Sequence, residues 1–179
     1  MDTRKKDNKG QSGCRIVATL LFFIAIGFCA MAQDTKPAPL PKVYDESVDA
    51  MAQIDKALEQ ARTEGKYVLC QVGGNWCPWC LRFANMVATD TALNRIVEQN
   101  YIYIHVNTSR ANKNAEAMKR LENPGRFGYP VFVILDENGR RLHTQNSVYL
   151  EEGKGYNRET VSKFLLNWTR KAIETIKLP

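Results

Sequence analysis

The sequence contains few residues that could bind a metal ion. Only two of its 179 residues are histidines, His105 and His143, and after residue 32 only Cys70 and one close pair of cysteines accompany them. Metal sites usually draw their ligands from closely spaced cysteine and histidine pairs. Because Cys70, His105 and His143 lack such spacing, we expect no metal site.

The sequence also lacks a dense basic stretch outside its N-terminal segment. The net charge is +6, and +3 of it lies in residues 1–32, where five basic residues stand against two acidic ones. Nucleic-acid binding usually requires a clustered basic surface, so no nucleic-acid partner is expected. No internal repeat is visible. Hydrophobic residues make up 44% and charged residues 25% of the chain, which is ordinary for one globular domain with extensions.

The first 32 residues have the three-part order of a signal peptide. A basic start precedes the apolar run 16–27, and Ala30-Met31-Ala32 supplies a small-x-small cleavage signal. Two alternatives remain open. A membrane anchor needs ~20 apolar residues, more than this run supplies, and a lipid on Cys29 needs a small residue before it, where Phe28 stands. We expect cleavage after Ala32 and a periplasmic or secreted protein that meets the membrane only through this segment.

Residues 33–46 have the composition of a linker. Pro37, Pro39 and Pro41 give this stretch a stiff, solvated character. The sequence therefore predicts three parts, which are a signal peptide over 1–32, a Pro-rich linker over 33–46 and a domain over 47–179.

The predicted domain alternates between helical and strand-like hydrophobic patterns. Helices are predicted after Cys77 and from Asp90, and also over 47–64, 110–122 and 158–177. Strands are predicted over 67–72, 101–106, 131–135 and 140–144. Strand–helix–strand succession implies parallel pairing through a right-handed crossover, and the final hairpin adds an antiparallel edge. This order predicts an α/β domain, with a mixed central β-sheet and helices on both faces.

A cysteine pair within Trp76-Cys77-Pro78-Trp79-Cys80 carries most of the functional information. Its spacing suits either a small disulfide or two metal ligands, and the surroundings distinguish them. A strand and a glycine-containing turn precede the pair, and a helix follows. Cys77 would lie at the helix N-terminus, where free N–H groups and the helix dipole stabilise a thiolate, and Pro78 suits the first helical position. This context favours a redox pair over a structural disulfide, since so short a loop adds little stability.

Thiol–disulfide exchange needs an attacking thiolate and a resolving thiol. We expect Cys77 to be the exposed nucleophile and Cys80, within the first helical turn, to be the more buried resolving thiol. Trp76 and Trp79 would form apolar walls on which a substrate docks. The exchange uses only cysteines, so no cofactor is expected.

The other candidate residues have simpler interpretations. Cys70 lies in a predicted central strand, where a small buried hydrophobe is expected. His105 is expected to be a surface or core residue rather than a catalyst, and His143 on the hairpin is expected to be solvated. Tyr101 and Tyr103 have the spacing of packing residues in a strand.

On these motifs the sequence resembles the thioredoxin family. The cysteine motif follows a strand, Tyr129-Pro130 precedes another, and the resemblance extends over the predicted domain. It is similar to secreted bacterial thioredoxin-like proteins, including the C-terminal domain of the transmembrane thiol:disulfide interchange protein. The resemblance implies the thioredoxin fold and a cis bond before Pro130, beside the disulfide. It also implies that the backbone of Tyr129 pairs with a substrate peptide.

Two features depart from the family pattern. Many thioredoxins carry a buried acid six residues before the first cysteine, where it assists proton transfer at the second. Gln71 occupies this position and cannot ionise. Pro78-Trp79 replaces the Gly-Pro of thioredoxin and is closer to the Pro-aromatic pair of glutaredoxins. Both argue against a plain thioredoxin-like reductase, but neither affects the exchange chemistry itself.

The sequence leaves two functions open. The first is an extracytoplasmic thiol:disulfide oxidoreductase that acts on cysteine-bearing protein substrates and works with a redox partner protein. The second is a redox-silent binding module on a thioredoxin fold, which would hold a protein partner in the tryptophan-lined groove or with the loop 149–156. The intact Cys77/Cys80 pair favours the first.

Overall fold

A mixed four-stranded sheet organises the protein. The computed structural model describes residues 38–175, so the predicted signal peptide and the first residues of the predicted linker lie outside it. The strand order is β2-β1-β3-β4, with bounds β1 (Tyr67–Gly73), β2 (Tyr101–Asn107), β3 (Val131–Leu135) and β4 (Arg141–Asn146). Strand β1 is parallel to β2, and β3 is antiparallel to both β1 and β4. The predicted mixed sheet, with its antiparallel hairpin at one edge, is confirmed.

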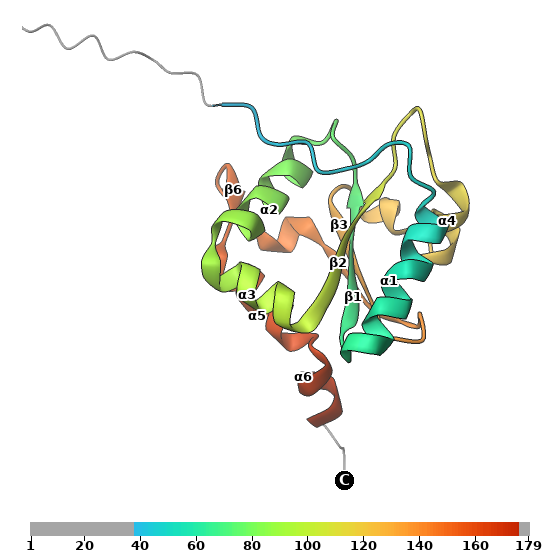
Figure 1. Ribbon diagram of the computed structural model, residues 1–179. Coiled ribbons are helices and arrows are strands. Elements are labelled where there is room, and N and C mark those ends of the chain that lie inside the picture. Colours follow the sequence, from blue (N-terminus) through green and yellow to red (C-terminus); the bar gives the residue numbers. More distant parts are fainter. Residues whose placement is uncertain (1–37, 176–179) are drawn as a thin grey trace, which may run out of the picture. The chain divides into compact units, whose positions relative to one another are not determined.

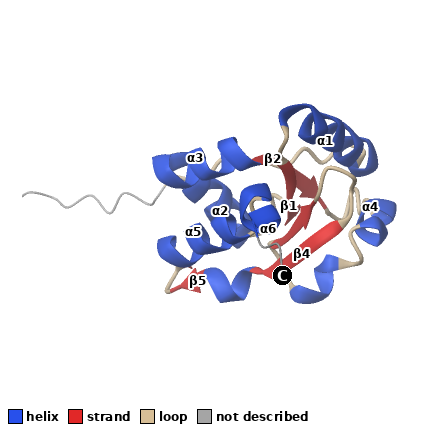
Figure 2. Cartoon of the chain, turned by 90° about the horizontal axis from the view of Figure 1, so that it is seen from below, coloured by secondary structure: helices blue, strands red, loops and turns tan. Residues whose placement is uncertain are grey.

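Helices cover both faces of this sheet, as predicted (Figures 1 and 2). One face carries α1 (Ala50–Glu64) and α4 (Ala115–Arg120), and the other carries α2 (Pro78–Thr89), α3 (Thr91–Asn100) and α5 (Arg158–Asn167). Within the part of the chain that the structure describes, no helix has both the length and the apolar character needed to cross a membrane.

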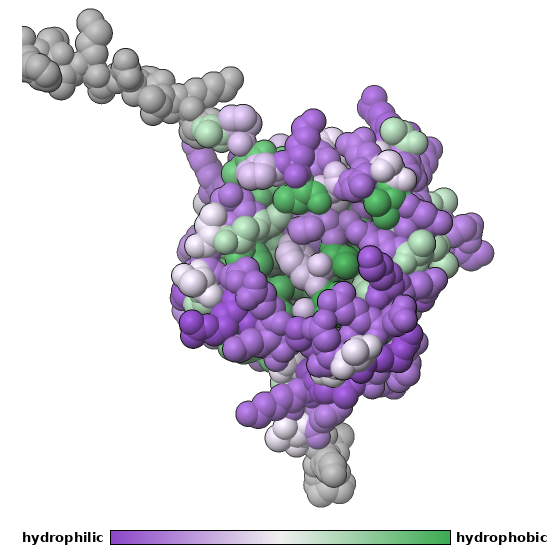
Figure 3. Space-filling view, in the orientation of Figure 1, coloured by the Kyte–Doolittle hydropathy of each residue, from purple (hydrophilic) through white to green (hydrophobic). Residues whose placement is uncertain are grey.

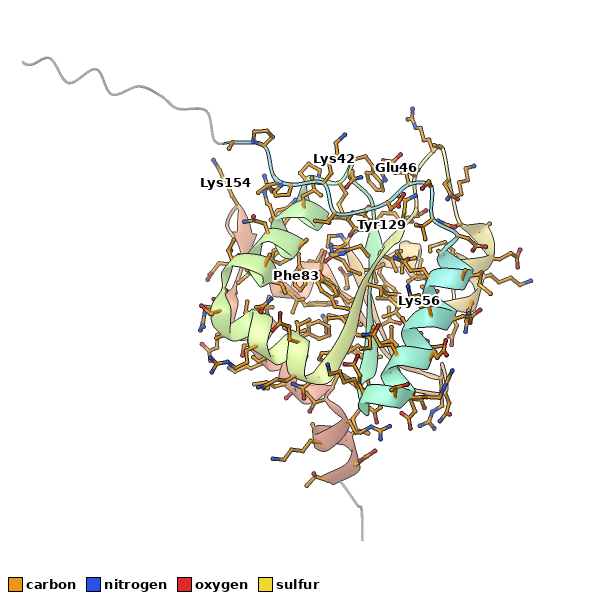
Figure 4. All side chains as sticks on the ribbon, viewed as in Figure 1. Lys42, Glu46, Lys56, Phe83, Tyr129 and Lys154 are labelled. Atoms are coloured by element: carbon orange, nitrogen blue, oxygen red, sulfur yellow. A yellow bond between two sulfur atoms is a disulfide. The ribbon has the colours of Figure 1, made fainter. Side chains whose placement is uncertain are left out.

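Successive side chains of β1 point alternately into the two hydrophobic cores, one on each face of the sheet. Val68, Cys70 and Val72 pack toward α1, whereas Tyr67 and Leu69 pack toward α2 and α3, because successive strand residues point to opposite faces. Residue 71 therefore shares the face of Leu69, and this is the face on which α2 begins. In this second core the rings of Phe83 and Phe132 lie 4.2 Å apart, and Figure 4 shows Phe83 pointing from α2 into the interior.

Several helices differ in extent from the prediction. Helix α1 begins at Ala50 rather than Ser47 because the Asp49 carboxylate caps it, accepting from the N–H of Met51 at 2.8 Å. It ends at Gly65, as predicted. Helix α4 is shorter than the predicted 110–122, since its N-cap Asn114 has a left-handed backbone that the helix cannot include.

The predicted last helix, 158–177, is two helices within the described residues. Helix α5 ends at Asn167 and α6 spans Arg170–Thr175. Thr169 separates them because its Oγ1 accepts from the N–H of Ala172 at 3.1 Å and so caps the second helix. His143, expected to be solvated, is partly buried, because its ring stacks on Trp168 with the centroids 4.1 Å apart.

The connection between β4 and α5 is more ordered than a simple loop. It contains a short helical turn, η2 (Ser147–Leu150), and a small hairpin formed by β5 (Glu151–Glu152) and β6 (Gly155–Tyr156). A second such turn, η1 (Pro124–Phe127), precedes β3. The hairpin brings Tyr156 against α2, where its ring contacts Trp79 and Phe83.

Candidate functional site

The cysteine pair lies where β1 passes into α2. Cys77 is the N-cap of the helix, Pro78 occupies its first turn, and Cys77 and Cys80 are joined by a disulfide with their Cα atoms 5.3 Å apart. The Cys77 Sγ accepts from the backbone N–H of Cys80 at 3.2 Å. A thiolate at Cys77 would receive the same bond together with the positive end of the helix dipole. The local geometry is therefore suited to an attacking thiolate at Cys77.

The two cysteines differ in burial, though less than the sequence suggests. Cys80 is fully buried, and Cys77 retains only 4% of its surface. The order agrees with the prediction, but in the disulfide form Cys77 is not openly exposed. The reason is that Cys77 belongs to a buried cluster with Tyr44 and Cys80, and Tyr129 packs onto this cluster.

The two tryptophans of the motif have different surroundings. Trp76 is 53% exposed; its Nε1 donates to the backbone oxygen of Thr108 at 2.9 Å, and its ring meets Tyr129 edge to face. Trp79 is partly buried between the ring of Tyr156 and the guanidinium of Arg82. Trp76 therefore offers the open apolar surface at the site, and Trp79 attaches α2 to the β6 hairpin.

An open pocket of about 980 Å³ adjoins Trp76. Trp76, Tyr129 and Met118 supply its largest apolar side chains, and the loop after β2 adds the basic residues Arg110 and Lys113. Figure 4 shows Tyr129 beneath the segment that carries Lys42 and Glu46. The pocket lies between Trp76 and α4, and neither Cys77 nor Cys80 lines it.

A cis peptide bond joins Tyr129 and Pro130, as the family resemblance implies. Pro130 is buried immediately before β3, whereas Tyr129 is partly exposed. The bond thus lies at the end of the sheet where the disulfide is found, with the Tyr129 ring between Trp76 and the cysteine cluster.

A buried polar network underlies the disulfide. Gln71 has no exposed surface, and its Nε2 donates to the backbone oxygen of Cys80 at 2.9 Å and to the hydroxyl of Tyr44 at 2.6 Å. The hydroxyl of Tyr103 donates to the Gln71 Oε1 through a short hydrogen bond. Burial raises the pKa values of the Tyr44 and Tyr103 hydroxyls well above their ordinary range. The network is therefore uncharged.

Comparison with known proteins places this site in a family. Residues 49–137 match the family model described as thioredoxin-like. The chain contains a thioredoxin-like domain. A disulphide isomerase from Xylella fastidiosa Temecula1 has a similar crystal structure, with a TM-score of 0.63, 22% identity, and coverage of 72% of this chain and 95% of that one.

A curated relative resembles the domain in sequence. It is the thiol:disulfide interchange protein DsbD of Actinobacillus pleuropneumoniae, 27% identical over 103 residues. The match covers 58% of this chain but only 17% of the relative. The likeness therefore concerns one domain of a much longer protein.

Two residues that the sequence analysis did not assign to the site belong to it. Tyr44 falls in the predicted linker, yet it is buried against the disulfide. Asn75 holds it there: the Asn75 Oδ1 accepts from the N–H groups of Val43 and Tyr44 at 3.1 Å each, and its Nδ2 donates to the Tyr44 oxygen at 2.7 Å. A lone aromatic residue among prolines was the only signal available in the sequence.

Tyr103 also has a more specific role than the packing predicted for it. In the parallel register of β1 and β2 it lies opposite Leu69, on the same face as Gln71. Its hydroxyl therefore reaches the Gln71 amide. Tyr101, two residues earlier, is a packing residue as predicted, with its hydroxyl bonded to the backbone oxygen of Leu165.

Cys70 is not part of the site. It lies in the central strand β1, fully buried on the α1 face, away from the core that contains the disulfide. Burial raises the pKa of its thiol to about 12, so it remains protonated at neutral pH. The expectation of a small buried hydrophobe is confirmed.

Proposed function

We propose that the protein is an extracytoplasmic thiol:disulfide oxidoreductase that exchanges disulfides with protein substrates through Cys77 and Cys80. This proposal rests on the Cys77–Cys80 disulfide at the N-terminus of α2, where Cys77 is the N-cap of the helix. In the reduced protein Cys77 attacks a substrate disulfide. Cys80 then displaces the substrate thiol from the mixed disulfide and closes the pair again.

The surroundings of Cys77 support a polypeptide as the substrate. Trp76 exposes an apolar ring next to the nucleophile, and the pocket beside it extends toward α4. As the family resemblance implies, the backbone of Tyr129, before the cis bond, would pair with an extended segment that carries the target cysteine. A redox partner protein would use the same surface to restore the starting state of Cys77 and Cys80.

A turnover assay tests this function. The protein should accelerate reduction of insulin by dithiothreitol or the refolding of scrambled ribonuclease, and Cys77→Ser should remove the activity. Cys70→Ala is the matched control, because Cys70 is a buried cysteine remote from the disulfide, and it should retain turnover. A folded wild-type protein with no turnover in either assay would favour the redox-silent binding module.

We also propose that the protein is exported and that residues 1–32 are removed. The support is the order of basic, apolar and small residues in that segment. An oxidising compartment would allow the Cys77–Cys80 disulfide to persist. Protein isolated from its native host should begin at Gln33; an intact Met1, or a lipid on Cys29, would contradict cleavage at this point.

A further inference from the structure

The hydroxyl of Tyr44 occupies an unusual position next to the resolving cysteine. It accepts a hydrogen bond from Gln71, which leaves the hydroxyl hydrogen available to donate elsewhere. Gln71 is held in this orientation from both sides, since its amide nitrogen also donates to the Cys80 carbonyl and its oxygen accepts from Tyr103. The direction of the bond to Tyr44 is therefore fixed by its neighbours.

Gly73 provides the space in which the Tyr44 hydroxyl and the Cys80 sulfur meet. A Cβ atom added at Gly73 would collide with the Cys80 Sγ and would lie 3.1 Å from the Tyr44 Oη. Both atoms thus border the same small volume, which stays open because residue 73 has no side chain. Tyr44, Cys77 and Cys80 accordingly form one buried cluster.

We propose that Tyr44 is a positioning residue for the resolving thiol: in the reduced protein its hydroxyl donates a hydrogen bond to the sulfur of Cys80 and stabilises the thiolate there. The inference rests on the proposed exchange function. In many thioredoxins a buried acid assists proton transfer at the second cysteine, but Gln71 occupies that position here and cannot ionise. The proposal gives this supporting role to Tyr44, which precedes α1.

The resolving step explains why such a donor is needed. Cys80 must lose its proton before it attacks the Cys77–substrate disulfide, and it is fully buried. Burial disfavours the thiolate and raises the pKa of a thiol. A hydrogen bond to the charged form acts in the opposite direction. Burial of Tyr44 raises the pKa of its own hydroxyl, so the group stays neutral and able to donate while Cys80 titrates.

The titratable side chains that face this cluster from β2 and β6 carry no charge at neutral pH. Tyr103 and His105 face it from β2, and Tyr156 faces it from β6. Burial raises the pKa values of both tyrosines and lowers that of His105 to about 4, so all three are neutral at pH 7. Cys77 is neutral as well while it is joined to a substrate.

Titration of Cys80 in the Cys77→Ser protein tests the proposal without requiring exchange activity. Thiolate formation is followed by ultraviolet absorbance against pH, and Cys70 does not interfere because burial raises the pKa of its thiol to about 12. Adding Tyr44→Phe keeps the ring and removes only the hydroxyl. We expect the pKa of Cys80 to rise, so that the thiolate fraction at pH 7 falls roughly tenfold.

Tyr101→Phe in the same background is the matched control. Tyr101 is also buried and also loses one hydrogen bond, to Leu165, but it lies at the opposite end of β2. It should leave the Cys80 titration unchanged. An unchanged Cys80 titration in a folded Tyr44→Phe protein, or an equal shift in Tyr101→Phe, would overturn the proposal.

The exchange reaction gives an independent readout. In the otherwise wild-type protein, Tyr44→Phe should shift the pH profile of glutathione release from Cys77 to higher pH, as measured by rapid mixing with oxidised glutathione. If Tyr44→Phe shifts the Cys80 titration but the wild type shows no turnover, the oxidoreductase function is rejected and the hydrogen bond from Tyr44 to Cys80 is retained. If the wild type shows turnover but Tyr44→Phe leaves the Cys80 titration unshifted, the function is retained and the role of Tyr44 is rejected.

Discussion

Cys80→Ser should trap substrate proteins as stable mixed disulfides on Cys77, whereas Cys77→Ser should trap none and lose exchange entirely. In the proposed mechanism Cys77, at the N-terminus of α2, attacks the substrate, and the fully buried Cys80 releases it. Without Cys80 the adduct has no internal nucleophile to displace it. A species that is short-lived in the wild type should therefore accumulate.

Expression with residues 1–32 in the native host allows the variants to meet their own partners. Adducts of Cys80→Ser should be seen on a non-reducing gel and should disappear with reductant, and mass spectrometry of the bands would identify the clients and the redox partner. Cys70→Ser is the control for a buried cysteine and should trap nothing. Adducts with Cys77→Ser but not with Cys80→Ser would reverse the two roles.

The oxidised protein should lose about 2 kcal/mol of its free energy of unfolding between pH 7 and pH 5 because of His105. Its Nε2 is buried and has no hydrogen-bond partner among the described residues, and burial lowers the pKa of the ring from 6.5 to about 4. Between these two values the unfolded chain binds a proton that the folded protein does not. Stability therefore falls as the pH drops from about 6.5 toward 4.

Denaturant unfolding at several pH values measures this slope. His105→Phe keeps a ring between Tyr44 and Tyr103 but cannot titrate, so it should flatten the dependence between pH 7 and pH 5. His143→Phe is the control for replacing the other histidine. Asp90, whose pKa is lowered by its bond to Arg158, contributes only at more acidic pH. An equal slope in His105→Phe and the wild type would show that another group is responsible.

The sequence was sufficient for the sheet and for the placement of Cys77 and Cys80 at the start of α2. The predicted strand patterns are five or six residues long and lie between glycine, proline or turn residues, and their ends agree with the observed strands to within two residues. The start of α2 was predictable because Cys77 and Pro78 are separately suited to the N-cap and to the first helical turn. Both signals are local, so they can be read without knowledge of the fold.

The residues that the sequence could not assign depend on contacts between distant segments. The hydrogen bond from Tyr103 to Gln71 joins residues 32 apart, and that from Gln71 to Tyr44 joins residues 27 apart. The break before α6 likewise follows from a single threonine cap and the stacking of Trp168 on a histidine from β4. No periodicity encodes such pairs, since each requires the strand register and the path of the chain before α1.

The path of the chain before α1 also determines where a tag or a fusion partner can be joined to the protein. The backbone of residues 43 and 44 is hydrogen-bonded to the side chain of Asn75, two positions before Cys77. The chain therefore enters the domain beside the Cys77–Cys80 disulfide. Helix α6 leaves at the opposite end of the sheet (Figure 1). In Figure 1 the entering segment, drawn in blue to cyan, runs over the end of the domain away from α6. The space-filling view from the same side shows a mostly hydrophilic surface with hydrophobic residues between the hydrophilic ones (Figure 3). A tag or fusion partner joined after α6 therefore lies at the end of the sheet opposite the Cys77–Cys80 disulfide, whereas one joined shortly before residue 43 lies beside it.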